Sequence, residues 1–170
     1  LALPDEAFVV FALGRLIAKK GFDDLLHAFA MAPAQTGGRS VFLVVAGDGP
    51  QQRELQALSA RLGLDARVRW AGWQNDPTPF YALAHAFACP SRHEPLGNVI
   101  LEAWQQRLPV LSTRNEGARE LVAEGRNALL ADVESPDDLA RGLRVMLDMG
   151  DADRRRLADA GHDTVRGEHG

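Results

Sequence analysis

Short hydrophobic runs alternate along the chain with segments in which hydrophobic residues recur at helical spacing. The runs are rich in β-branched and aromatic residues and continuously apolar, which is typical of strands covered on both faces. Helical spacing is clearest where Phe22, Leu25, Leu26 and Phe29 follow one another. The pattern predicts strands over residues 8–13, 41–46, 68–71, 86–89, 110–112 and 128–131.

Further helices are predicted from hydrophobic spacing together with start signals. Leu55, Leu58 and Leu62 follow Pro50, which suits the first position of a helix. The segment SPDD at 135–138 has the order of an N-cap, a proline at the first helical position and an acid at the third. Strand and helix thus alternate about six times. This predicts an α/β domain whose doubly wound parallel sheet has about six strands and helices on both faces.

Length and charge limit the function classes. The 170 residues suffice for one domain with its own core. The net charge of −4 gives no bulk basic field, so we expect no nucleic-acid partner. The single cysteine, Cys89, lies in an apolar stretch and is interpreted as a small buried residue rather than a reactive thiol.

The loop after the first predicted strand, GRLIAKKG, is a candidate anion site, because parallel sheets bind ligands beyond the carboxyl ends of their strands. Gly14 allows a sharp turn, Arg15 stands at the strand end, and Lys20 lies close to the start of the next helix. A guanidinium and an ammonium group near a helix N-terminus suit a diphosphate. A solvated basic loop is the alternative.

The segment PSRHEPLGNVILEA contains a second candidate site. Glu94 lies in a turn, a helix is expected to start near Gly97, and Glu102 lies about one turn inside it. The amides of Leu96, Gly97 and Asn98 would be free to bind a ligand. Carboxylates only accept hydrogen bonds, so one acid beside a ribose diol and one beside a hexose diol would bracket a nucleotide sugar. A polar residue on a helix face is the alternative for Glu102, although its sequence neighbours are apolar.

The remaining motifs predict no second type of site. No group of His, Asp and Cys has metal-ligand spacing, so we expect no metal ion. The segment GDGP after the second long strand lacks the glycine pattern of dinucleotide sites, which disfavours a dehydrogenase. His93 is interpreted as a solvated loop residue. Trp70 and Trp73 are interpreted as packing residues, with contact between Trp73 and a base as the alternative.

In order and spacing, these motifs resemble the family-four retaining glycosyltransferases of the GT-B fold. The stretch from Glu94 to Glu102 looks like the paired-glutamate motif of that family, and GRLIAKKG looks like its phosphate-binding motif. The resemblance extends from about Phe8 to Leu147. It implies that residues 1–170 form one Rossmann-like, nucleotide-sugar-binding domain, half of a GT-B fold. The N-terminal acceptor domain would then be absent from this chain.

The resemblance also implies a role for each matching residue. Arg15 and Lys20 match the diphosphate ligands, Glu94 the acid near the donor sugar, and Glu102 the acid that binds the ribose hydroxyls. Arg15, Lys20 and Glu94 are therefore the residues that the resemblance predicts to be catalytic. Trp73 matches the region near the base. The implied reaction transfers a hexose from a nucleotide diphosphate sugar to a lipid or saccharide acceptor, with retention and without metal or cofactor. A cytoplasmic protein, peripheral to the inner face of the membrane, is expected.

The chain departs from the family pattern in two places. Pro95 and Leu96 stand where a glycine or serine and then a phenylalanine are common, and Asn115 and Glu116 stand where small residues are common. These departures concern sugar specificity more than fold. Two other readings stay open at this point: a nucleotide-sugar-binding module without catalysis, and another GT-B enzyme such as a sugar-nucleotide epimerase.

Overall fold

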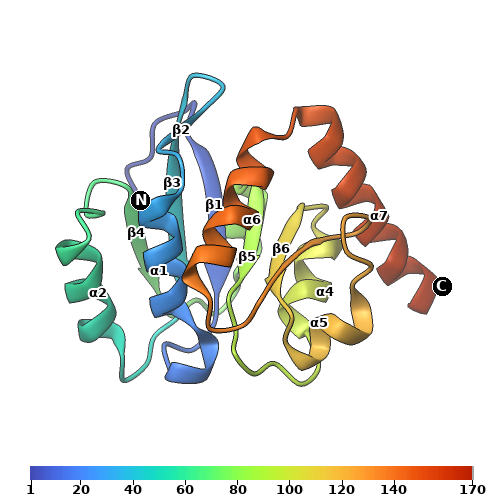
Figure 1. The fold of residues 1–170 in the computed structure, drawn as a ribbon, viewed down its shortest axis with the longest axis horizontal. Helices are drawn as coiled ribbons and strands as arrows, with labels where there is room; N and C mark the ends of the chain where they lie inside the picture. The colour runs from blue at the N-terminus through green and yellow to red at the C-terminus, as the bar shows by residue number, and fades with distance from the viewer. Residues whose placement is uncertain (170) are drawn as a thin grey trace.

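The computed structural model describes the backbone of residues 1–169 and the side chains of residues 1–167. It alternates strands and helices as the hydrophobic pattern predicts (Figure 1). The strands are β1 (Phe8–Leu13), β2 (Gln35–Thr36), β3 (Arg39–Ala46), β4 (Val68–Gly72), β5 (Ala86–Cys89), β6 (Val110–Thr113) and β7 (Leu129–Ala131). The helices are η1 (Ala18–Lys20), α1 (Phe22–Met31), α2 (Gln52–Arg61), α3 (Thr78–Leu83), α4 (Asn98–Gln105), α5 (Glu116–Leu121), α6 (Pro136–Asp148) and α7 (Asp151–His169).

The main sheet is parallel and has the strand order β4-β3-β1-β5-β6-β7. The short strand β2 adds to it as an antiparallel partner of β3. From β1, the chain first builds the sheet in one direction through β3 and β4, and then returns to add β5, β6 and β7 on the other side. The predicted doubly wound α/β sheet is therefore confirmed. The direction reverses between β1 and β5, and ligands in such sheets bind at this switch point.

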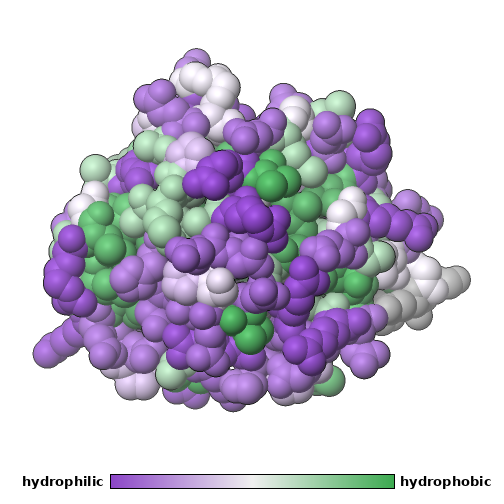
Figure 2. Space-filling model, viewed as in Figure 1, coloured by the Kyte–Doolittle hydropathy of each residue, from purple (hydrophilic) through white to green (hydrophobic). Residues whose placement is uncertain are grey.

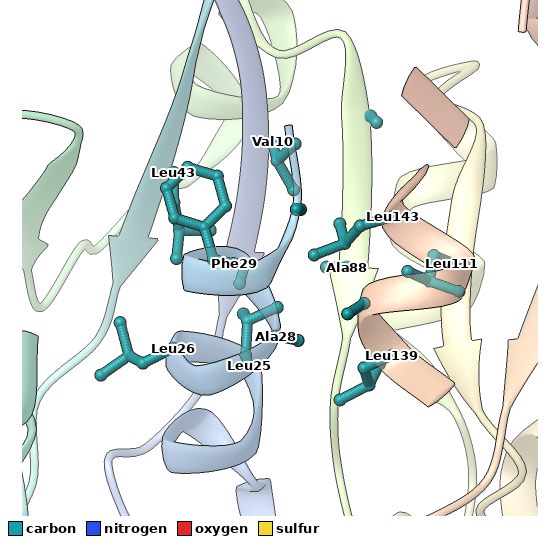
Figure 3. Packing of buried hydrophobic residues seen from close by; sticks show 14 of the residues in the cluster. Val10, Leu25, Leu26, Ala28, Phe29, Leu43, Ala88, Leu111, Leu139 and Leu143 are labelled. Atoms are coloured by element: carbon teal, nitrogen blue, oxygen red, sulfur yellow. The ribbon is translucent and has the colours of Figure 1, made fainter. Parts of the chain in front are cut away.

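Helices cover both faces of the sheet. On one face, α1 and α6 lie side by side (Figure 1). Leu25 and Phe29 of α1 pack toward Val10 and Leu43 of the sheet, and Leu143 of α6 belongs to the same buried cluster (Figure 3). All five are at most 2% exposed, and burial of such a side chain contributes about 1.5 to 3 kcal/mol. The outer side of this face is mostly hydrophilic (Figure 2).

The opposite face is covered by α3, α4 and part of α7, which supply Tyr81, Trp104 and Val165 to a second core cluster. Trp104 is fully buried, and its indole Nε1 donates to the carbonyl of Asn127 at 3.0 Å. Buried Cys89 belongs to the same cluster, as expected, and burial raises the pKa of its thiol. No helix within residues 1–169 is both long enough and apolar enough to cross a membrane.

The predicted helix starts are right at one position and wrong at another. Ser135 Oγ accepts a hydrogen bond from the amide of Asp138 at 3.2 Å, so the predicted N-cap of α6 is confirmed. Pro50, in contrast, lies in the turn before α2 rather than at its first position. The amide of Gln51 donates to the carbonyl of Leu16, which ties this turn to the loop after β1 and delays the helix to Gln52.

Candidate functional site

The loops that follow β1 and β5 lie against each other at the carboxyl edge of the sheet, the lower edge in Figure 1. The carbonyl of Lys19 accepts hydrogen bonds from the amides of Arg92 and His93 at 2.8 and 3.2 Å. Gly21, at φ 68°, makes this approach possible, because a Cβ there would lie 2.1 Å from the carbonyl oxygen of Pro90. The two motifs singled out in the sequence therefore meet at the switch point.

Arg92 stabilises the contact between the loops after β1 and β5. Its guanidinium forms ion pairs with Asp23 at 3.0 Å and Asp24 at 3.1 Å, both in the first turn of α1. These hydrogen bonds, above all that with Asp24, raise the pKa of Arg92. Arg92 was not predicted as a site residue, because no local sequence signal connects a loop arginine with acids 68 and 69 positions away. Its role is to hold the loop after β5 against the start of α1.

Lys20 and Glu94 form the central contact of the candidate site. Lys20 Nζ lies 2.6 Å from Glu94 Oε2, and the hydroxyl of Ser91 donates to the same oxygen at 3.1 Å. The two charged side chains are only 20% and 11% exposed. A pair this well shielded from water interacts more strongly than a surface ion pair. The structure thus joins two of the three residues predicted to be catalytic.

Arg15, the third of them, lies just beyond β1 and is exposed. Among the backbone and side-chain groups of residues 1–167, its guanidinium has no hydrogen-bond or ion-pair partner, so its charge is available to an anion. The backbone around it is fixed, because Gly14 donates to the carbonyl of Ala46 and Leu16 to that of Asp48. The loop after β1 is thereby tied to the loop after β3.

The start of α4 is at the predicted position, with Gly97 as the residue before the helix at φ 66°. Its backbone packs closely on the start of α5, where a Cβ at Gly117 would lie 2.4 Å from the amide nitrogen of Gly97. The amide of Gly117 also donates to the carbonyl of Glu94 at 2.7 Å. The amides of Leu96, Gly97 and Asn98 have no acceptor within the described part of the chain. They form the donor end of a helix at the same edge as Arg15.

Glu116 also contributes to the site, although its sequence position indicated only a departure from the family pattern. Its Oε1 accepts a hydrogen bond from the amide of Glu94 at 3.1 Å, and its Oε2 lies 3.2 Å from Nδ1 of His93. Hydrogen bonds from its own amide, from that of Glu94 and from His93 lower the pKa of Glu116 to about 2. The interpretation of His93 as solvated is right in that its side chain is 67% exposed. It also pairs with Glu116, which orients the loop carrying Glu94.

Glu102 lies one turn inside α4, as predicted, but not among apolar side chains. Ile100 and Trp104 turn toward the core, whereas Glu102 is on the exposed side of the helix. Helical spacing separates sequence neighbours onto different faces, so its apolar neighbours do not bury it. Its Oε2 accepts a hydrogen bond from the hydroxyl of Tyr81 in α3 at 2.9 Å.

The packing interpretation holds for Trp70 and is wrong for Trp73. Trp70 is partly buried against the core, whereas Trp73 is 66% exposed directly after β4. β4 is at the end of the parallel sheet, so no further strand covers the residue that follows it. An aromatic ring is therefore exposed at the carboxyl edge.

Several cavities lie elsewhere on the molecule. One of about 480 Å³ is lined by Arg39, His85, Arg107 and Arg154 at the amino ends of the strands. These arginines are already bound to protein groups: Arg39 to backbone carbonyls, Arg107 to Asp159 and Arg154 to Asp151. We favour the open carboxyl edge, because its cation Arg15 and its helix-start amides have no partner among the described groups of residues 1–167. No group of three or more metal-ligating side chains occurs among residues 1–167, whose side chains the structure describes.

Comparison with known proteins decides the family. A model of the family described as "Glycosyl transferases group 1" matches residues 1–164. The chain belongs to this family. It is 41% identical over 168 residues to the lipopolysaccharide core biosynthesis glycosyltransferase LpsE of Rhizobium meliloti, covering 99% of this chain and 47% of LpsE. The chain spans about half the length of the curated relatives it matches.

Solved structures agree with this membership. The fold matches HepE of Anabaena, solved in complex with UDP and glucose, with a TM-score of 0.86 and 29% identity over 95% of this chain and 44% of that one. It also matches the C-terminal domain of LpcC, a group 1 family protein of Francisella tularensis, with a TM-score of 0.84 and 22% identity over 95% of this chain and 86% of that one. The second likeness concerns the fold alone. The predicted glycosyltransferase family and the predicted Rossmann-like domain of the GT-B fold are confirmed, whereas membership of the retaining family four stays a prediction.

Proposed function

We propose that this chain is the donor-binding domain of a glycosyltransferase that transfers a hexose from a nucleotide diphosphate sugar to an acceptor. Retention at the anomeric carbon is proposed from the resemblance to the retaining family. This chain spans about half the length of the curated relatives it matches, which supports a further domain in the whole protein. Its place N-terminal to these residues and its role in binding the acceptor are proposed from the resemblance. We propose no metal ion and no cofactor besides the donor, because cationic side chains can take the charge of the leaving group.

The meeting of Lys20 with Glu94 at the switch point between β1 and β5 carries this proposal. It places a cation and an acid side by side where doubly wound sheets bind ligands. Arg15, exposed at the end of β1, supplies a second cation at the same edge. A diphosphate needs such cations, and a hexose with several hydroxyls suits the carboxylate beside them.

In the proposed reaction, Arg15 and Lys20 stabilise the negative charge that develops on the leaving diphosphate. Preorganised charges of this kind supply much of the rate enhancement in many enzymes. The amides of Leu96, Gly97 and Asn98 add donors from the start of α4. Glu94 accepts hydrogen bonds from hydroxyls of the donor sugar and, through its pair with Lys20, keeps the sugar next to the diphosphate.

The nucleoside is proposed to lie toward Glu102 and Trp73. Glu102 would accept from the ribose hydroxyls, and the exposed ring of Trp73 would lie against the base. HepE has been solved in complex with UDP and with UDP-glucose, which makes UDP the first nucleotide to test.

The acceptor is proposed to be a lipid or a saccharide attached to one. The name of LpsE, a lipopolysaccharide core biosynthesis glycosyltransferase, supports this choice. A membrane-bound acceptor and a nucleotide-sugar donor meet at the cytoplasmic surface of a membrane. The whole protein is therefore proposed to be cytoplasmic and peripheral to the inner face of the membrane.

Calorimetry with UDP, GDP, ADP and their sugars tests the binding site. Arg15→Ala and Lys20→Ala should each weaken binding of the preferred diphosphate roughly tenfold to a hundredfold, because a hydrogen bond to a charged group is worth about 1.5 to 3 kcal/mol. Binding of the nucleoside alone should change little. Lys19→Ala is the matched control, since Lys19 has the same charge in the same loop and is exposed. Equal losses in all three variants would point to a general charge effect and contradict the site.

A further inference from the structure

Tyr81 joins the proposed ribose ligand Glu102 to the centre of the sheet. Its hydroxyl donates to Glu102 Oε2 at 2.9 Å, although the residue itself is only 4% exposed. Its ring stacks on Phe87 of β5 with centroids 5.6 Å apart and meets Phe11 of β1 edge-on at 5.1 Å. The hydroxyl is thus fixed relative to the two strands that flank the switch point.

We propose that Tyr81 is a positioning residue that holds Glu102 for recognition of a ribose diol. The tyrosine hydroxyl binds one carboxylate oxygen, Oε2, and the other oxygen stays available to accept from the 2′- and 3′-hydroxyls of a nucleotide. This inference rests on the proposed function, in which the chain binds a nucleotide diphosphate through its ribose.

The physical reason lies in the exposure of Glu102. An exposed glutamate has several rotamers, and ordering it on a ligand costs binding free energy. A hydrogen bond from a rigid, buried phenol orders the carboxylate before the nucleotide arrives. Burial and the nearby charge of Glu102 raise the pKa of Tyr81, so the phenol remains a donor across the physiological range.

Packing alone is the rival explanation for Tyr81. A buried hydroxyl needs a hydrogen-bond partner, and Glu102 could serve only to satisfy it. The two explanations differ in what removal of the hydroxyl does. Under packing alone, Tyr81→Phe changes stability but not which nucleotides bind. Under positioning, the same variant loses preference for ribose over 2′-deoxyribose.

The test compares UDP, GDP and ADP with their 2′-deoxy forms by calorimetry. Wild-type protein should prefer the ribose form of its best nucleotide by about tenfold, since one hydrogen bond to a charged group is worth at least that factor. Glu102→Gln should abolish most of this preference, and Tyr81→Phe should reduce it to about threefold or less. Affinity for inorganic pyrophosphate should stay unchanged in both variants. Phe80→Leu is the matched control, because Phe80 stacks on Phe11 but donates no hydrogen bond.

Tyr81 is the sole tyrosine in the sequence, so its ring signal can be assigned in the NMR spectrum without substituting Tyr81 itself. In protein carrying isotope-labelled tyrosine, the ribonucleotide should shift the Tyr81 ring signal more than pyrophosphate does. Glu102→Gln should remove that difference. This measurement decides the matter if Tyr81→Phe does not fold.

The outcomes separate this inference from the proposed function. If Tyr81→Phe binds nucleotide with the wild-type ribose preference, positioning by Tyr81 is wrong while the proposed function stands. If Tyr81→Phe weakens pyrophosphate and nucleotide equally, its effect is structural and the inference is wrong. If the wild-type protein binds diphosphates without any ribose preference, both the ribose role of Glu102 and this inference fall. If no diphosphate binds, the proposed function itself fails.

Discussion

Replacing Lys20 should weaken diphosphate binding, whereas replacing its partner Glu94 should strengthen it. Lys20→Met removes a cation that the diphosphate needs. Glu94→Gln keeps the shape of the side chain but removes a negative charge that lies 2.6 Å from Lys20. A diphosphate bound by Lys20 has to share this cation with Glu94. The Gln variant should therefore bind UDP more tightly than the wild-type protein, and the Met variant less tightly.

The size of the effect follows from the geometry. Lys20 Nζ lies 2.6 Å from Glu94 Oε2 and would lie about 2.8 Å from a bound phosphate oxygen. The carboxylate oxygen and the phosphate oxygen are then at most about 5 to 6 Å apart. At about 6 Å two unit charges repel by about 0.7 kcal/mol in water and about 2.8 kcal/mol at an effective dielectric constant of about 20. The partly buried pair lies between these limits. An intermediate value of about 1.4 kcal/mol corresponds to about tenfold tighter binding of UDP by Glu94→Gln.

Calorimetry with UDP rather than a nucleotide sugar isolates this effect, because UDP offers no hexose for Glu94 to bind. Lys20→Met removes a shielded hydrogen bond to a charged group, so denaturant unfolding should show it destabilised by about 1.5 to 3 kcal/mol. Glu94→Gln should be destabilised by less, because its amide oxygen can still accept from Lys20 and Ser91 and only the ionic part of the contact is lost. The double variant should be destabilised by less than the sum of the two. Equal weakening of UDP binding in both variants would refute the reasoning, since the charge of Glu94 would then not oppose the diphosphate and Glu94 would be a purely structural residue.

Three further predictions concern packing and pH. Gly117→Ala should destabilise the fold by about 1 to 3 kcal/mol in denaturant titrations, because its Cβ would lie 2.4 Å from the backbone of Gly97. Gly167→Ala in helix α7 is the control and should be neutral or stabilising, because a Cβ at Gly167 would have no neighbouring atom within 4 Å. Burial and nearby arginines lower the pKa of His85, so below about pH 6.5 the unfolded chain binds more protons than the folded one. The free energy of unfolding should therefore decrease as the pH falls below this value, by up to about 1.4 kcal/mol per pH unit more in the wild type than in His85→Gln. Burial raises the pKa of Tyr81, so stability should fall above about pH 10 more steeply in the wild type than in Tyr81→Phe, and tyrosinate absorbance should appear only as the chain unfolds. A parallel pH dependence in either variant and its wild type would contradict the corresponding pKa argument.

The strands were the easiest part to predict from the sequence. β1 and β5 have the predicted bounds, because continuous apolar runs and the glycine or proline after them define a buried parallel strand locally. The motif loops were found for the same reason, since a ligand site in this fold follows strands in the chain. The short helix α3 and the two-residue strand β2 were not predicted. Both are too short for periodicity to show.

Partners distant in sequence could not be predicted. The contact of Lys20 with Glu94 depends on the close approach of Gly21 to Pro90, and nothing local encodes that distance. Tyr81 has an ordinary hydrophobic position in α3, so its hydrogen bond to Glu102 has no sequence signal either. The exposure of Trp73 was misjudged because it depends on β4 being the end strand, and strand order is set by the whole fold.

The most direct test of the site is a titration of isotope-labelled chain with UDP, followed through its backbone amide signals. We predict that the perturbed amides cluster at the carboxyl edge, in residues 14–21 and 91–98 and around Glu102. Lys20→Ala should reduce these changes at a given UDP concentration, and Lys19→Ala should not. Perturbations centred instead on the cavity of Arg39, His85 and Arg107 at the amino edge would contradict the account, because the nucleotide would then bind at the wrong end of the sheet.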